Sequence, residues 1–103
     1  SAKKNASFSK KIEIEVEKVD DVLEAAQNGA DIIMFDNMSP DQVEDSIKLL
    51  KDNNLRKKVI VEISGGITKD NIVDYILAEP DVISVGGITQ FPFEKVDLSL
   101  RFD

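Results

Sequence analysis

The 103-residue chain has a formal net charge of −7, and 42% of its residues are hydrophobic, which is typical of one small globular domain. It contains neither cysteine nor histidine, which excludes disulfides, thiolate metal sites and histidine-based acid–base catalysis. The negative charge disfavours nucleic acid and anionic membranes as partners, and no apolar run reaches about 20 residues, so we expect a cytoplasmic protein without a membrane span.

The first part of the chain predicts strand, helix and strand in turn. Lys11–Glu17 ("KIEIEVE") alternates isoleucine or valine with glutamate, and this period of two predicts a strand. Asp20–Gly29 predicts a helix, because acidic residues lie at its start and glycine at its end. Ile32–Phe35 predicts a short buried strand that is closed by Asp36 and Asn37.

The clearest helix is predicted in "SPDQVEDSIKLLKDNN". Ser39 is placed to cap it, Pro40 suits its first position, and Gln42 completes a capping box. Val43, Ile47 and Leu50 recur at helical spacing and form an apolar stripe.

The second half repeats the alternation of strand and helix. Residues 57–64 ("KKVIVEIS") predict a third strand, and residues 68–79 predict a helix capped by Thr68. Val82–Val85 predicts a fourth strand, and Lys95–Leu100 a last strand or an extended tail.

This order predicts an α/β fold with parallel strands and right-handed crossovers. Four strand–helix units form either a small open sheet or half of an eight-unit barrel. The glutamate face of the first strand would point into the lumen of a barrel, or into solvent on an edge strand. Periodicity alone leaves both possibilities open.

Carboxylates gather at the strand ends, where ligands of parallel α/β proteins bind. Alternate residues of a strand point to the same face of a sheet, and if neighbouring strands align, Glu15, Asp36 and Glu62 could converge at the carboxyl end of that face. Such carboxylates repel one another, and Mg²⁺, a cationic intermediate or ribose hydroxyls would offset that repulsion. The alternative is that each is an ordinary acidic residue at the end of a strand.

Two glycine pairs lie after adjacent strands, Ser64–Gly66 after the third and Gly86–Gly87 after the fourth. Glycine lets backbone N–H groups turn toward an anion, and a helix beginning at Thr68 would add the positive end of its dipole. The alternative is a plain turn between strand and helix. The second pair favours a phosphate-binding site, because barrels often bind phosphate with the loops that follow two late strands.

Four ordered motifs, "KIEIEVE", "GADIIMFDNMSP", "VEISGGIT" and "DVISVGGIT", followed by "VDLSLRFD", resemble one known family. They are similar to the C-terminal part of the nicotinate-nucleotide pyrophosphorylases, also called quinolinate phosphoribosyltransferases. The resemblance implies roughly half of an incomplete TIM-like barrel, from a homo-oligomer whose chain also has a sandwich domain. It implies a reaction of NAD biosynthesis in which quinolinate and phosphoribosyl pyrophosphate, with Mg²⁺, give nicotinate mononucleotide, pyrophosphate and CO2.

The resemblance also assigns residues. Glu15 and Asp36 match the carboxylates near the ribose hydroxyls, the metal and the developing oxocarbenium ion, whereas Glu62 lies in a matching motif without an assigned role. Gln90 stands where the family often has histidine, and its amide can bind phosphate without a positive charge. The phosphate-binding positions are matched by Ser64, Gly65, Gly66, Gly86 and Gly87.

The family's basic cluster for quinolinate lies upstream of these motifs. We therefore expect residues 1–103 to be the C-terminal half-barrel segment of a longer enzyme, inactive alone and associated with the remainder of that enzyme or with its own copies. Two alternatives stay open. One is a non-catalytic half-barrel for phosphate binding or assembly, and the other is a paralogue that acts on nicotinate or serves metal transport.

Overall fold

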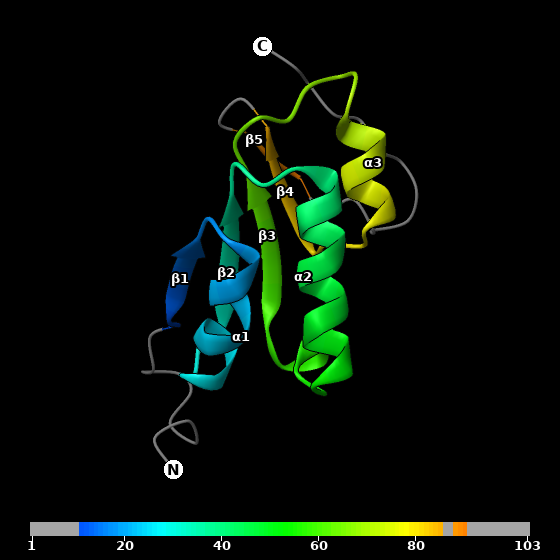
Figure 1. Cartoon of the computed structure of the whole chain (residues 1–103). Coiled ribbons are helices and arrows are strands. Elements are labelled where there is room, and N and C mark those ends of the chain that lie inside the picture. Colours follow the sequence, from blue (N-terminus) through cyan, green and yellow to red (C-terminus); the bar gives the residue numbers. More distant parts are fainter. Residues whose placement is uncertain (1–10, 86–87, 91–103) are drawn as a thin grey trace.

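A computed structural model describes residues 11–85 and 88–90, which form one mixed sheet with helices against it (Figure 1). The strands lie in the order of the sequence, β1-β2-β3-β4-β5. The first four are parallel, and β5 runs antiparallel to β4. The strand bounds are β1 Glu13–Val16, β2 Ile32–Asp36, β3 Ile60–Ser64, β4 Val82–Val85 and β5 Ile88–Gln90.

The helices are α1 (Val19–Gln27), α2 (Pro40–Asp52), the short 3₁₀ helix η2 (Arg56–Lys58) and α3 (Ile72–Leu77). Helices α1 and α2 lie on one face of the sheet, and α3 packs against α2. Parallel strands in sequential order put their crossover helices on the same face, as in a barrel, whereas a doubly wound sheet divides them between two faces. The predicted α/β fold with consecutive strand–helix units is therefore confirmed.

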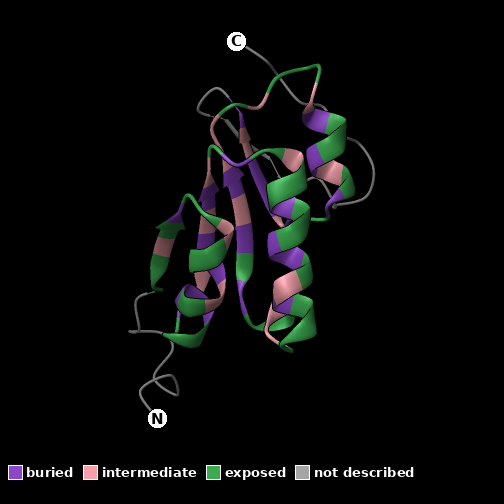
Figure 2. Cartoon of the chain, viewed as in Figure 1, coloured by how far each residue is buried: buried purple, intermediate pink, exposed green. Residues whose placement is uncertain are grey.

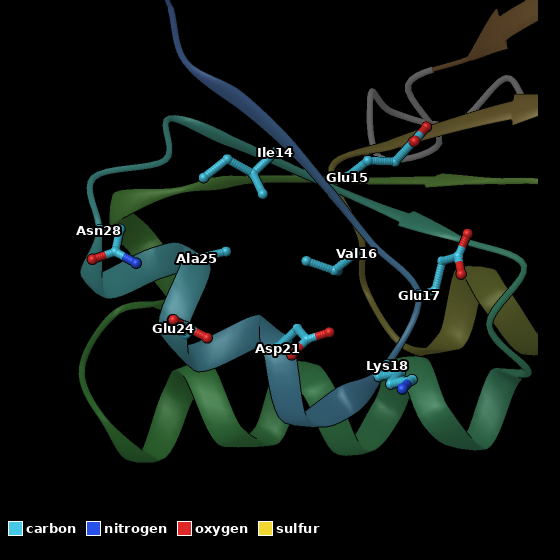
Figure 3. A pocket seen from close by; sticks show the side chains of 9 residues that line it. All are labelled: Ile14, Glu15, Val16, Glu17, Lys18, Asp21, Glu24, Ala25 and Asn28. Atoms are coloured by element: carbon cyan, nitrogen blue, oxygen red, sulfur yellow. The ribbon is translucent and has the colours of Figure 1, made fainter.

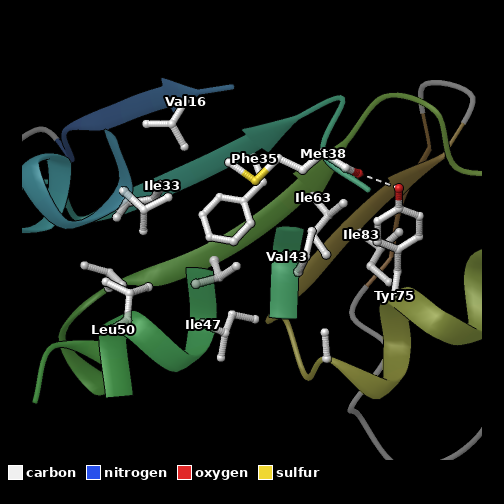
Figure 4. Packing of buried hydrophobic residues seen from close by; sticks show 14 of the residues in the cluster. Val16, Ile33, Phe35, Met38, Val43, Ile47, Leu50, Ile63, Tyr75 and Ile83 are labelled. Atoms are coloured by element: carbon white, nitrogen blue, oxygen red, sulfur yellow. Dashed lines mark hydrogen bonds between the residues drawn. The ribbon is translucent and has the colours of Figure 1, made fainter. Parts of the chain in front are cut away.

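The core lies between the helices and the side of the sheet that faces them (Figure 2). Phe35 on β2 and Ile63 on β3 are fully buried against the apolar stripe of α2 (Figure 4). The helix residues that contribute most are Val22, Val43, Ile47 and Leu50. Each such side chain contributes about 1.5–3 kcal/mol when it leaves water, so this one face supplies most of the stability of the fold.

The start of α2 forms as predicted. Ser39 Oγ accepts a hydrogen bond from the Gln42 N–H at 3.2 Å, and Gln42 Oε1 accepts one from the Ser39 N–H at 2.9 Å. Pro40 occupies the first helical position, where it has no hydrogen bond to lose. The capping box therefore sets where the chain turns from β2 into α2.

Two predicted boundaries differ from the structure by three residues. Lys57 and Lys58 belong to η2 rather than to the third strand. Arg56 holds that turn, because its guanidinium donates to the carbonyls of Val59 and Glu79 and to Asp81.

The third helix begins at Ile72 and not after Thr68. Residues 68–71 form a turn in which Asn71 Oδ1 accepts a hydrogen bond from the Thr68 N–H at 2.7 Å. Thr68 nevertheless makes the contacts of a cap, because its Oγ1 accepts from the Asp70 N–H at 3.2 Å and its carbonyl accepts from the Ile72 N–H at 3.0 Å. The turn at residues 68–71 therefore leads directly into the regular helix.

Tyr75 links α3 to the segment after β2. It is 3% exposed, and its hydroxyl donates to the Met38 carbonyl at 2.5 Å, the dashed line in Figure 4. Burial raises the pKa of this hydroxyl above its ordinary value of 10.0. The hydroxyl is thus a neutral donor at physiological pH.

Among the described helices, none is long and apolar enough to cross a membrane. The predicted last strand, Lys95–Leu100, lies outside the described residues.

Replacing Ser39 by alanine should lower the free energy of unfolding by about 1 kcal/mol, because the Gln42 N–H loses its acceptor at the start of α2. Urea denaturation followed by circular dichroism measures the change. Ser39→Asp is the matched control, since aspartate keeps an acceptor at the cap. Equal losses in the two variants would show that the capping hydrogen bond contributes nothing.

Tyr75 is the sole tyrosine in a chain without tryptophan, so the ultraviolet absorbance of phenolate reports on it alone. Its titration midpoint in the folded protein should lie above 10.0. The stability gained from the neutral hydroxyl is fully present below the pKa of an unfolded tyrosine and is lost as pH rises through the folded pKa. A midpoint at or below 10.0 would contradict the buried contact with Met38.

Candidate functional site

The carboxyl ends of β2, β3 and β4 bring three polar side chains into one row. The register pairs Asp36 with Ser64, and Ser64 with Ser84. All three are partly exposed, on the face of the sheet opposite α1 and α2. The predicted parity of Asp36 and Ser64 is thereby confirmed, and Ser84 joins them.

A second row lies one step nearer the amino ends of the strands. It contains Glu15, Met34 and Glu62, in register on β1, β2 and β3. Figure 3 shows that Glu15 and Val16 project to opposite sides of β1, with Val16 toward α1. Glu62 is held in place by Ser84, whose Oγ donates to Glu62 Oε2 at 3.0 Å.

The three acidic residues share a face but do not form one cluster. Glu15 and Glu62 lie on either side of β2, which separates their backbones by about 10 Å, and Asp36 is one row further along. Within the described part of the chain, no group of three acidic side chains lies close enough to hold a metal ion. Glu15, Asp36 and Glu62 thus share one face of the sheet without forming a three-ligand metal group in the described residues.

The segments after β2 and β3 meet at Gly65. The Asn37 N–H donates to the Ser64 carbonyl at 3.0 Å, which continues the sheet ladder into the loops. A Cβ on Gly65 would lie 2.8 Å from Asn37 Oδ1 and 3.0 Å from Asp36 Oδ1. With φ of +85° as well, position 65 requires glycine for its backbone conformation and for this close approach.

Gly66 continues the turn with φ of +76°, and the side chain of Asn71 fixes the backbone from Gly66 to Thr68. Asn71 Nδ2 donates to the Gly66 carbonyl at 2.8 Å, while its Oδ1 accepts from the Thr68 N–H at 2.7 Å. Sequence reasoning missed this residue. The available signal was an asparagine three residues after Thr68, a spacing at which its side chain can reach back to the turn.

The later start of α3 removes the helix dipole as an argument for anion binding at Ser64–Gly66. Its first residue, Ile72, comes six positions after Gly66, and the helix has six residues. The dipole effect acts within the first turn of a helix, so α3 does not direct it at the glycines. Any preference of this loop for anions rests on its backbone N–H groups.

The second glycine pair, Gly86–Gly87, lies outside the described residues, and so does the side chain of Gln90. The backbone of Gln90 is in β5, opposite Ile83.

A hollow of about 400 Å³ lies between β1 and α1, at the edge of the sheet (Figure 3). Of the predicted site residues it includes Glu15 alone, together with apolar Ile14 and Val16 on the side of β1 nearer α1. The hollow is thus separate from the junction at Gly65.

The sequence profile described as "Quinolinate phosphoribosyl transferase, C-terminal domain" matches residues 1–101. The chain is 45% identical over 95 residues to a probable carboxylating nicotinate-nucleotide pyrophosphorylase of Archaeoglobus fulgidus, covering 92% of this chain and 36% of that protein. It is 48% identical over 97 residues to the protein of that name in Methanothermobacter thermautotrophicus, covering 94% and 34%. The chain therefore spans about a third of the length of these relatives.

The chain is also similar to solved structures of nicotinate-nucleotide pyrophosphorylases. The nicotinate-nucleotide pyrophosphorylase of Francisella tularensis superposes with a TM-score of 0.66 and 37% identity, covering 84% of this chain and 29% of that one. The enzyme of the same name from Ehrlichia chaffeensis gives a TM-score of 0.67 at 28% identity, covering 87% and 32%.

Gly65→Ala and Gly29→Ala form a matched pair, because both glycines have positive φ but only Gly65 contacts neighbouring side chains. Gly29→Ala should destabilise by about 1–2 kcal/mol, the cost of a left-handed conformation with a Cβ. Gly65→Ala should cost about 1 kcal/mol more, because its methyl group must displace the side-chain oxygens of Asn37 and Asp36 and would lie 3.2 Å from the Asn37 backbone nitrogen. Equal losses in chemical denaturation would contradict the close contact of the two loops.

Proposed function

The chain belongs to the quinolinate phosphoribosyl transferase C-terminal domain family, and on that premise we propose that it forms the ribose-phosphate-binding part of a phosphoribosyltransferase. The reaction joins quinolinate to phosphoribosyl pyrophosphate and gives nicotinate mononucleotide, pyrophosphate and CO2. The name of the relatives, nicotinate-nucleotide pyrophosphorylase [carboxylating], describes this chemistry in the reverse direction.

The observation that carries the proposal is the junction of the two loops at Gly65. A carboxylate, Asp36, and a glycine backbone that offers N–H groups lie side by side at the carboxyl ends of β2 and β3. A ribose phosphate presents hydroxyl donors and an anionic acceptor on one small molecule. The junction thus complements both parts, with Asp36 for the hydroxyls and Ser64, Gly65 and Gly66 for the phosphate.

The residues divide the chemistry between them. Asp36 and Glu15 accept hydrogen bonds from the ribose hydroxyls, and their negative charge stabilises the oxocarbenium character that develops as pyrophosphate leaves. Glu62, held by Ser84, adds charge to the same face. Ser64 and the glycine N–H groups anchor the phosphate, so that the remote binding energy orients the reacting carbon.

The carboxylate oxygens on this face of the sheet are ligands that Mg²⁺ prefers, but the described residues do not surround an ion by themselves. Asp36 and Glu15 would hold it, directly or through water or ribose hydroxyls, as carboxylate oxygens commonly do for this ion. When bound, the ion supplies positive charge to the pyrophosphate leaving group. The phosphate oxygens would then complete a coordination shell that no three acidic side chains of the described residues provide.

Gly86, Gly87 and Gln90 complete the proposed site as a second phosphate loop. We assign residues 1–103 to the C-terminal half-barrel segment of a cytoplasmic enzyme, which associates with the remainder of that enzyme or with its own copies. The 103-residue segment alone should bind ribose phosphate without converting quinolinate.

Calorimetric titration with phosphoribosyl pyrophosphate and Mg²⁺ tests the proposal in the full-length polypeptide that carries the chain. Gly65→Val should weaken binding at least about tenfold, because its branched side chain displaces Asp36 and Asn37. Asp36→Asn should lower turnover with a smaller effect on binding. Asp45→Asn, an exposed site on α2, is the matched control.

Circular dichroism confirms that each variant is folded before titration. Equal binding by wild type and a folded Gly65→Val variant would refute the phosphate loop. Full activity of Asp36→Asn would remove that carboxylate from the mechanism.

A further inference from the structure

The short helix α3 contacts both loops of the candidate site through two side chains one turn apart. Asn71, at its N-terminal cap, binds the loop after β3, and Tyr75 binds the segment after β2. Residues four apart lie on the same side of a helix, so the two contacts form one rigid support. We propose that Asn71 and Tyr75 form a clamp that positions the two halves of the site, an inference that rests on the proposed ribose-phosphate function.

Asn71 performs a task that few side chains can. Its amide accepts from the Thr68 N–H at 2.7 Å and donates to the Gly66 carbonyl at 2.8 Å. Aspartate lacks the donor, and serine is too short to span both groups. The amide thus closes the turn from Gly66 to Thr68 from one side.

This contact also directs the backbone donors of the loop. In a planar trans peptide the C=O and the following N–H point in opposite directions. Because the Gly66 carbonyl is drawn to Asn71, the N–H of Ile67 points away from that side chain. Asn71 thereby sets the orientation in which this peptide meets a phosphate on the glycine loop.

Tyr75 supports the other half of the site from within the core. Its hydroxyl donates to the carbonyl of Met38, which is 1% exposed and lies two residues after Asp36. Ser46 Oγ lies 3.8 Å from Met38 Sδ, so that this anchor is held from α2 as well. A displacement of α3 would therefore alter the spacing between Asp36 and the glycine loop.

The test compares Asn71→Ala, Asn71→Ser and Tyr75→Phe with Asn53→Ala in the full-length polypeptide. Asn53 is the matched control, because its Nδ2 also donates to a backbone carbonyl, that of Leu49, at 2.9 Å, at the far end of α2. Asn71→Ser keeps a helix cap if Asn71→Ala fails to fold. The first measurement is affinity for ribose 5-phosphate by calorimetry, well below each variant's unfolding midpoint.

The second measurement is hydrogen exchange of the Thr68 amide without ligand. Both Asn71 variants should weaken ribose 5-phosphate binding about fivefold or more and speed exchange at Thr68, whereas Asn53→Ala changes neither. Tyr75→Phe should weaken binding and leave exchange at Thr68 near the wild-type rate. This split distinguishes positioning from a general loss of stability, which would move both readouts in every variant.

The outcomes separate the clamp from the function. Absence of ribose 5-phosphate binding by wild type would refute the proposed function, and Thr68 exchange would still decide whether Asn71 holds the loop. Wild-type affinity in both Asn71 variants would overturn the positioning role. Unchanged exchange at Thr68 in those variants would overturn the clamp itself.

Discussion

Burial of one face of the sheet is the constraint on which the rest of the structure depends. Ile33, Phe35, Val61 and Ile63 must all face the helices, since exposing any of them would cost about 1.5–3 kcal/mol. A slip of one residue would turn each strand over, so this burial fixes the register. The same register fixes the residues that alternate with the core positions, so Asp36 lies beside Ser64 on the opposite face of the sheet.

The amino ends of the strands use a repeated device that protects the same register. The Asp31 carboxylate accepts from the Ile12 N–H, and the Asp81 carboxylate accepts in the same way from the Val61 N–H. Asp31 immediately precedes β2 and binds the residue just before β1, and Asp81 immediately precedes β4 and binds a residue of β3. Arg56 joins the second of these contacts. These contacts tie the strands together at their amino ends, which is the end of the sheet opposite the candidate site.

Features that depend on interactions between residues close in the sequence could be predicted, whereas features that depend on residues far apart in the sequence could not. The cap at Ser39 and the strand Val82–Val85 depend on neighbours in sequence, and both were predicted correctly. The start of the third helix was not, because residues 68–71 close one separate turn before the regular helix begins at Ile72. The link between Ser84 and Glu62 joins residues 22 positions apart and has no local pattern.

The sequence by itself determined the alternation of strands and helices, the residues that face the core and the motifs that identify the family, because hydrophobic period and turn chemistry are local properties. Only the tertiary structure decided which of the candidate residues meet. It brought Gly65 against Asp36 and Asn37 and left Glu15 and Glu62 on opposite sides of β2. The physical reason is that strand spacing and backbone conformation, rather than residue type, set the distances between side chains on different strands.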